Sequence, residues 1–327
     1  MDLITQETIF LFLYTVASIG MLYFGADFLI SGALSTAARL KISEMVVSIT
    51  LIAWATSLPE LFVLSKAISL PNGSTIAYGT IIGSNFANLC LVLGLSILIK
   101  FKQRSSFNFF AFKNFIPISI FSTLIFCIYG LNLFDSLVVK KLLSVLMIIA
   151  VIILYVFKAN KETNTYLKQE TKAFSIRRTL LYVIIGSLLL ALGSEFLVKT
   201  GLMLQNDFGV PASFIGSTYF ALASSSPEIF TSLLAIFKYK KHDVVIGNVI
   251  GSNLANICIF GIIALIFNTK SIMLGSSPSL LLASLEIAIF GIFILYYFKS
   301  NKEKTIRVHS IVGFLLFCVY YLFYKFL

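Results

Sequence analysis

Charged residues are scarce in this sequence. Asp, Glu, Lys and Arg together make up 12% of the 327 residues, whereas hydrophobic residues make up 58%. Soluble globular domains usually carry about 25% charged and about 45–50% apolar residues. The shortage of charge excludes an ordinary soluble domain, and the apolar excess predicts an integral membrane protein.

Strict alternation of apolar and polar residues is absent as well, which excludes the strands of a membrane β-barrel. A membrane helix instead needs about 20 mainly apolar residues, and the sequence contains ten segments of this kind. We therefore predict an all-α membrane protein with ten transmembrane helices. Their expected bounds are Ile9–Ile30, Met45–Leu70, Ile76–Ile99, Phe115–Leu133, Leu137–Phe157, Thr179–Val198, Val210–Phe237, Val244–Phe267, Leu280–Phe298 and Ile311–Phe326.

Residues that commonly build catalytic or thiolate metal sites are few and scattered. The four cysteines lie in apolar segments without metal or redox spacing, and we interpret them as packing residues. The two histidines, His242 and His309, flank predicted helices, and no paired aspartates occur in the membrane segments. An intramembrane enzyme needs a nucleophile or a metal-binding pair, so the sequence predicts neither enzyme activity nor a cofactor.

The net positive charge of +11 is unevenly distributed along the chain. Of the 25 basic residues, 19 fall in alternate loops between the predicted helices. Loops rich in Lys and Arg stay on the cytoplasmic side of a membrane, so the pattern predicts a multi-pass protein of the cell membrane with both termini outside. The placement of this charge excludes nucleic acid as a partner. The lipid bilayer is the expected partner, and no obligate protein partner is evident.

The sequence repeats itself with an offset of 168 residues. The offset holds from position 27 to position 88 without insertion or deletion, and it aligns Pro59 with Pro227 and Asn85 with Asn253. Each half contains five predicted helices, an odd number, so the second half enters the membrane in the opposite sense. Inverted repeats of this kind are typical of secondary transporters.

The repeat also defines the expected domain organisation. Residues 1–157 form the first five-helix repeat, with motifs at 53–60 and 79–88. Residues 158–178 form a cytoplasmic linker. Residues 179–327 form the second, inverted five-helix repeat, with motifs at 221–228 and 247–256.

Each half places a proline beside a carboxylate within an apolar segment. Pro59 lacks an N–H group and its ring clashes with the carbonyl of Ala55, so it bends the helix and frees backbone oxygens beside Glu60. Irregular backbone at membrane depth is tolerated where it lines a cavity. A charged side chain there costs about 2.5–3.5 kcal/mol on insertion scales, and such residues are usually functional. The duplicated Pro-Glu pair therefore indicates a site inside the membrane.

The side chains near these carboxylates are rich in oxygen. Thr56 and Glu60 share a helix face, as do Ser84 and Asn88, because each pair is spaced i and i+4. Carboxylate, hydroxyl and carbonyl oxygens suit Ca²⁺ or Na⁺, and Ca²⁺ takes about 6–8 of them. The candidate ligands are Thr56, Ser57, Glu60, Ser84 and Asn88 in the first half and Ser224, Ser225, Glu228, Ser252 and Asn256 in the second.

Three other acidic residues lie in predicted helices. Asp27 and Glu195 are matched by the repeat, and they either flank an ion path or pair with a basic residue near the membrane surface. Glu286 has Ile118 at its repeat position, and we interpret it as structural or close to the surface.

At the two motifs of each half the sequence resembles the sodium/calcium exchanger family, the prokaryotic branch of the cation/Ca²⁺ exchanger superfamily. Family members carry two inverted repeats, each with a G-T-S-L-P-E-like motif followed by G-N-x-x-G-S-N-x-x-N/D. The stretches here are Ala-Thr-Ser-Leu-Pro-Glu (55–60), Gly-Thr-Ile-Ile-Gly-Ser-Asn-Phe-Ala-Asn (79–88), Ala-Ser-Ser-Ser-Pro-Glu (223–228) and Gly-Asn-Val-Ile-Gly-Ser-Asn-Leu-Ala-Asn (247–256).

The resemblance implies an antiporter that extrudes Ca²⁺ in exchange for Na⁺ by alternating access, with three Na⁺ for each Ca²⁺. Glu60 and Glu228 would ligate either ion, the neutral side chains would supply the remaining oxygens, and backbone carbonyls would fall at Ala53 and Ala221. The first and sixth helices would slide past the core. An exchanger of H⁺ for Ca²⁺ that uses the same glutamates is the alternative. A purely structural membrane protein is disfavoured by the duplicated polar segments.

The sequence departs from the family pattern at several positions. Alanine replaces the glycine before the hydroxyl residues in both halves, and Thr80 stands where the motif has asparagine. Asn256 occupies a position that is aspartate in many relatives, notably the potassium-dependent ones. With asparagine at both Asn88 and Asn256 the site has no third carboxylate to hold K⁺, so we expect exchange without K⁺.

Overall fold

The structure is a computed structural model that describes residues 3–68, 73–102, 115–131, 136–153, 173–210, 219–267 and four residues between 315 and 319. Every regular element in these ranges is helical. The elements are α1 (Leu3–Leu40), α2 (Glu44–Val47), η1 (Ser48–Ile52), α3 (Ala53–Thr56), α4 (Leu58–Ala67), α5 (Gly73–Ala87), η2 (Asn88–Val92), α6 (Leu93–Lys102), α7 (Ile116–Gly130), α8 (Leu137–Ile153), α9 (Ile176–Asn206), α11 (Phe220–Ser224), α12 (Ser226–Phe237) and α13 (His242–Ile266).

The predicted membrane helices agree with the described elements in type and place. Within the described ranges, four helices are long and apolar enough to cross a membrane: Glu7–Leu40, Ser74–Ile99, Ile176–Asn206 and His242–Ile266. A fifth span is added if Glu44–Thr56 and Leu58–Ala67 are counted together. The all-helical membrane class is therefore confirmed.

The predicted count of ten helices stays a prediction. The described parts of the segments Phe115–Leu133, Leu137–Phe157 and Val210–Phe237 contain the shorter helices α7, α8, α11 and α12. The segment Leu280–Phe298, most of Ile311–Phe326 and the greater part of the predicted linker lie outside the described residues.

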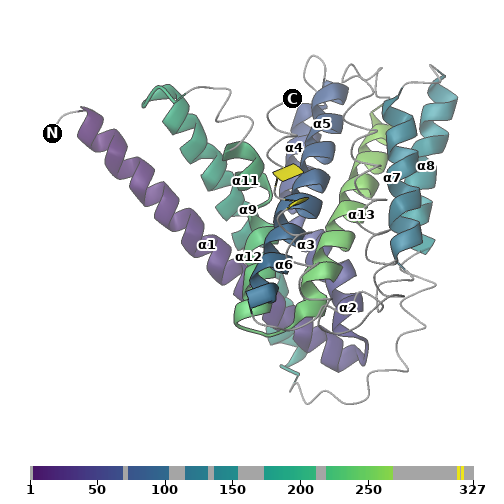
Figure 1. The fold of residues 1–327 in the computed structure, drawn as a ribbon, viewed down its shortest axis with the longest axis horizontal. Coiled ribbons are helices and arrows are strands. Elements are labelled where there is room, and N and C mark those ends of the chain that lie inside the picture. The colour runs from purple at the N-terminus through teal and green to yellow at the C-terminus, as the bar shows by residue number, and fades with distance from the viewer. Residues whose placement is uncertain are drawn as a thin grey trace.

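The two longest helices, α1 and α9, pack against each other and run antiparallel. Gly25 faces Leu190, whereas Gly32, further along α1, faces Val183, earlier on α9. They lie side by side at one edge of the molecule (Figure 1). The two helices approach closely because glycines on each helix face the backbone of the other. A Cβ added at Gly186 would lie 2.8 Å from the Gly25 carbonyl oxygen. Helices that the repeat makes equivalent thus have opposite directions.

Helix α13 forms the centre of the described fold. It contacts α3, α5, α7, α8, α12 and η1, and Figure 1 shows it between the α7–α8 pair and the rest of the bundle. Its polar motif residues Asn248, Ser252 and Asn256 are all fully buried. A helix that buries side chains on all sides must find internal partners for its polar groups.

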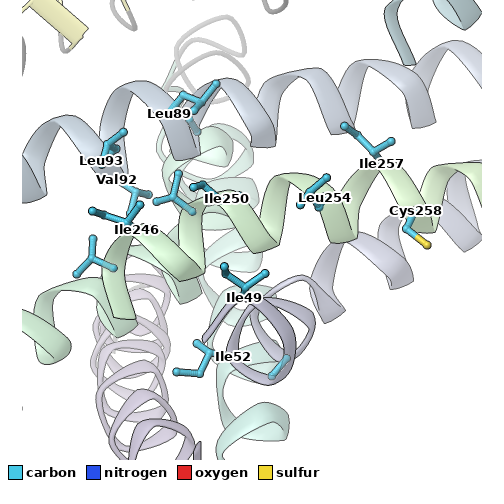
Figure 2. Close-up of a cluster of buried hydrophobic side chains, with 14 of the residues drawn as sticks. Ile49, Ile52, Leu89, Val92, Leu93, Ile246, Ile250, Leu254, Ile257 and Cys258 are labelled. Atoms are coloured by element: carbon cyan, nitrogen blue, oxygen red, sulfur yellow. The ribbon is translucent and has the colours of Figure 1, made fainter. Parts of the chain in front are cut away.

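The apolar part of the core surrounds this central helix. In Figure 2, Ile246, Ile250 and Leu254 of α13, in the second half, lie between two elements of the first half. One is η2 with the start of α6, which contributes Leu89, Val92 and Leu93, and the other is η1, which contributes Ile49 and Ile52. The apolar packing fixes α13 against both motif segments of the first half.

Candidate cation-binding site

Both proline motifs break their helices in the same way. The chain leaves helical geometry at Ser57, with φ −85° and ψ 6°, and at Ser225, with φ −86° and ψ 5°. In each case a new helix begins at the next residue with proline in its first turn. The first break bends the span by 42°. The bend predicted at Pro59 is confirmed, and the acidic residues in the first turns of α4 and α12, Glu60 and Glu228, are both buried.

The carbonyl oxygens freed by the prolines have different surroundings in the two halves. In the second half the Ala223 oxygen accepts hydrogen bonds from Ser194 of α9 at 2.8 Å and from Ser226 at 2.7 Å. The repeat positions of these two serines in the first half are Ala26 and Leu58, which carry no hydroxyl. Ser194 is not among the predicted site residues, although its mismatch with Ala26 in the repeat is visible in the sequence.

The two carboxylates follow the helix breaks and are buried. Glu60 is 1% exposed and Glu228 is fully buried. Ser84 of α5 donates a hydrogen bond to Oε1 of Glu60 at 2.7 Å. Thr56, one turn before Glu60, is linked through Asn248 to Thr231, which is one turn after Glu228, so the two carboxylates flank one network of side chains. Two buried carboxylates in one place need cations or protons to balance them.

Several buried oxygens of the predicted ligands accept no hydrogen bond within the described part of the chain. Leaving a buried polar atom without a partner costs about 1–3 kcal/mol, so a group of them in one place indicates a site for a bound ligand. They are Glu60 Oε2, both Glu228 carboxylate oxygens, Ser57 Oγ, Ser225 Oγ, Asn88 Oδ1 and Asn256 Oδ1. The set comes from both halves of the chain.

The Thr56 hydroxyl connects the first helix break to α13. It lies 3.1 Å from Ser252 Oγ, 3.2 Å from Asn248 Oδ1 and 3.1 Å from the Ala53 carbonyl oxygen. A hydroxyl has one hydrogen to donate and two lone pairs to accept with, so Thr56 Oγ1 and Ser252 Oγ keep oxygen lone pairs while they hydrogen-bond to their neighbours. Such a group is a suitable environment for a small hard cation.

The structure places the predicted site residues as follows. Like the two glutamates, Thr56, Ser57, Ser84, Asn88, Ser225, Ser252 and Asn256 are buried, and Ser224 is half-buried at the end of α11. The Ala53 carbonyl accepts bonds from the Ser57 N–H and from Thr56. Ala221 lies in α11, within one turn of the second break.

Four buried polar residues outside the predicted set take part in the site. Asn248 accepts from Thr56 and donates to Thr231 Oγ1 at 2.9 Å. Asn85 and Asn253 hydrogen-bond with each other's backbone and with the predicted ligands. For the three asparagines the available signal was their place in the Gly-Asn and Gly-Ser-Asn motifs, whereas Thr231 lies outside the motifs.

Asp27 and Glu195 both pair with lysines. Asp27 lies 2.6 Å from Lys238 at the end of α12 and accepts a hydrogen bond from Tyr239. Glu195 lies 3.4 Å from Lys199, and both side chains are about half exposed. Of the two interpretations left open by the sequence, the structure supports pairing with a basic residue. Glu286 lies outside the described residues.

The described helices are those of a multi-pass membrane protein with carboxylates, hydroxyls and amides buried between them, and comparison with known proteins identifies its family. A family model described as sodium/calcium exchanger protein matches residues 10–159 and again residues 178–326. The chain therefore belongs to the sodium/calcium exchanger protein family, a class of membrane transporters that move ions.

Individual relatives cover most of the chain. The putative antiporter CaxA of Alkalimonas amylolytica is 28% identical over 253 residues, which is 75% of this chain and 77% of CaxA. The sodium/calcium exchanger MaX1 of Methanosarcina acetivorans is 23% identical over 325 residues, 85% of this chain and 90% of MaX1. A structure of the sodium-calcium exchanger NCX_Mj, soaked with 2.5 mM Na⁺ and 10 mM Sr²⁺, matches with a TM-score of 0.76 and 25% identity, covering 96% and 97% of the two chains.

Proposed function

We propose that this chain is an antiporter that exchanges Na⁺ for Ca²⁺ by alternating access and extrudes Ca²⁺. The observation that carries the proposal is the set of buried oxygens without hydrogen-bond donors around Glu60 and Glu228. Such a set is costly in an empty protein and is compensated when a hard cation binds. The names of MaX1 and NCX_Mj support Na⁺ and Ca²⁺ as the ions exchanged.

The roles of the residues follow from their charges. Glu60 and Glu228 contribute about −2 when both are ionised, which one Ca²⁺ neutralises. Sodium ions need the same carboxylates and the neutral oxygens of Thr56, Ser84 and their counterparts, so the two cations compete for overlapping ligands. With three Na⁺ for each Ca²⁺, every cycle carries one net charge across the membrane.

The voltage response and the K⁺ requirement test this count of charges. Moving one charge is worth about 2.3 kcal/mol per 100 mV, so Ca²⁺ uptake into Na⁺-loaded proteoliposomes should accelerate when the interior is made positive. Uptake should also persist when choline replaces all K⁺, because Asn88 and Asn256 provide no third carboxylate. An uptake rate that does not change with membrane voltage would contradict the proposed stoichiometry. A strict K⁺ requirement would contradict the proposed count of carboxylates.

We also propose that the membrane topology follows the two inverted repeats, with both termini outside the cytoplasm. The antiparallel packing of α1 and α9 supports opposite directions for equivalent helices. It also puts the exposed residues Lys41 and Asp207, which follow the two helices, at opposite ends of the pair.

Cysteine labelling in intact cells tests this orientation. The native cysteines, of which Cys90, Cys127 and Cys258 are buried, are first replaced by alanine. A cysteine at Asp207 should react with an impermeant maleimide added outside, because the basic loops place Lys41 in the cytoplasm. A cysteine at Lys41 should react only after the membrane is permeabilised. The reverse pattern would overturn the orientation.

A further inference from the structure

Asn85 and Asn253 are the repeated asparagines of the Gly-Ser-Asn motifs, and neither is among the ligands proposed above. Both are buried, with exposures of 0% and 2%. The side-chain N–H of Asn85 donates to the backbone carbonyl of Asn253 at 3.3 Å, and that of Asn253 donates to the backbone carbonyl of Asn85 at 3.4 Å. The two halves of the protein therefore meet in a reciprocal pair of amides.

This pair fixes which way each amide points. A backbone carbonyl only accepts hydrogen bonds, so the NH₂ ends of Asn85 and Asn253 must face the opposite backbone. Their Oδ1 atoms are consequently left as acceptors on the other side. There they receive the NH₂ groups of two proposed ligands: Asn88 donates to Asn253 Oδ1 at 3.1 Å, and Asn256 donates to Asn85 Oδ1 at 3.0 Å.

The consequence is a fixed orientation of Asn88 and Asn256. Their NH₂ groups are held by the asparagine pair, and Asn256 donates in addition to Ser84 Oγ at 3.1 Å. Their Oδ1 atoms are buried and accept no hydrogen bond from any described residue. Only the oxygen end of a carboxamide can ligate a cation, and a flipped amide would present two N–H donors to it.

We propose that Asn85 and Asn253 are positioning residues that hold the carboxamide oxygens of Asn88 and Asn256 toward the transported cation. The inference rests on the proposed function, because it assigns these oxygens to the same site. The arrangement is crossed: Asn253, in the second half, orients the ligand of the first half, and Asn85 orients the ligand of the second. Each half of the site is therefore preorganised by the other.

The two positioning contacts, Asn253 with Asn88 and Asn85 with Asn256, can be tested separately by mutation. Replacing Asn253 by alanine removes the acceptor for Asn88, but it leaves the Asn253 backbone carbonyl that anchors Asn85. The orientation of Asn256 should then survive. Asn253→Ala should act through Asn88 alone, and Asn85→Ala should act through Asn256 alone.

The test is a double-mutant cycle on equilibrium binding of radioactive Ca²⁺ to the purified full-length protein, measured over a wide Ca²⁺ range. Variants are first checked for a monodisperse peak in size-exclusion chromatography. Asn253→Ala should weaken Ca²⁺ binding about tenfold, the size expected from one buried hydrogen bond. In an Asn88→Ala background the same change should have an effect below about twofold, because no amide remains to be oriented.

A matched background shows whether the effect is specific. In an Asn256→Ala protein, Asn253→Ala should still weaken binding about tenfold. The mirrored cycle, Asn85→Ala with and without Asn256→Ala, independently tests the contact between Asn85 and Asn256. This cycle is sufficient if Asn253→Ala does not fold. Equal losses with and without Asn88, or no loss at all, would overturn the positioning role. Failure of the unmodified protein to bind Ca²⁺ would instead overturn the proposed function on which the inference rests.

Discussion

Replacing either Glu60 or Glu228 by glutamine should abolish Na⁺-driven Ca²⁺ flux while the protein still folds and inserts. Glutamine has the same shape, but it removes one of the two negative charges that balance Ca²⁺. It also brings an NH₂ group among buried oxygens that are proposed to face a cation. Breaking a buried charge interaction costs about 3–5 kcal/mol, which corresponds to a loss of more than about a hundredfold.

The matched control is Glu195→Gln. Glu195 is also a membrane-helix glutamate, but its side chain is 53% exposed and pairs with Lys199 on the same helix. An exposed pair of this kind contributes about 0–1 kcal/mol, so flux should change less than about fivefold. Substantial flux in Glu60→Gln or Glu228→Gln, or an equal loss in the control, would contradict the assigned roles.

The second large effect is expected at the contact between α1 and α9. A Cβ at Gly186 would lie 2.6 Å from the backbone nitrogen of Leu29, where no flexible side chain can move away. Gly186→Ala should therefore push the helices apart, at a cost of about 1–3 kcal/mol. The melting temperature of the purified protein should fall, and exchange should fall with it because these are the helices proposed to slide past the core.

Gly20→Ala provides the control for this change. Gly20 also lies in α1, but a Cβ there meets nothing within 4 Å. Alanine is favoured over glycine in a helix by about 1 kcal/mol, so this variant should be as stable as the unmodified protein or more so. Equal behaviour of Gly186→Ala and Gly20→Ala would show that the close contact does not matter.

The positions of the helices were predicted well wherever apolar composition alone decides them. The first helix shows the limit, because Ile9–Ile30 was predicted and the helix runs from Leu3 to Leu40. Its last turns contain hydroxyl residues that lower the apolarity. These hydroxyls are hydrogen-bonded within the protein: Thr36 donates to the Gly32 carbonyl, and Ser35 hydrogen-bonds with Thr179 of α9. Partners on another helix are invisible to a count of apolar residues.

The candidate ligands could be predicted because the chemistry lies in local spacing. Proline next to glutamate, with hydroxyls one turn away, is visible in each half without knowledge of the fold. The orienting amides could not be predicted in this way, because Asn85 acts on Asn256 across a separation of 171 residues. Periodicity gives the face of a helix on which a side chain lies, but not which end of an amide points inward.

The contact between Asn85 and Asn256 changes the effect expected of Asn256→Asp. If charge alone mattered, the added carboxylate should make the site bind cations more tightly. In the structure, however, the Asn256 NH₂ group lies 3.0 Å from Asn85 Oδ1, and aspartate would put an oxygen there instead. Two acceptors without a hydrogen between them repel each other. We therefore expect part of the gain in Ca²⁺ affinity to be lost, and recovered when Asn85 is also replaced by alanine.

In the proposed function, a Na⁺ gradient directed opposite to Ca²⁺ movement drives Ca²⁺ through a site built on Glu60 and Glu228. Uptake of radioactive Ca²⁺ into proteoliposomes of the purified protein, loaded either with Na⁺ or with choline at an acid interior pH, tests it most directly. If the protein exchanges Na⁺ for Ca²⁺, uptake should be rapid with internal Na⁺ and should stay at background with the proton gradient alone. Glu60→Gln should show no uptake under either condition. Uptake driven by the proton gradient without Na⁺ would contradict it and identify an exchanger of H⁺ for Ca²⁺.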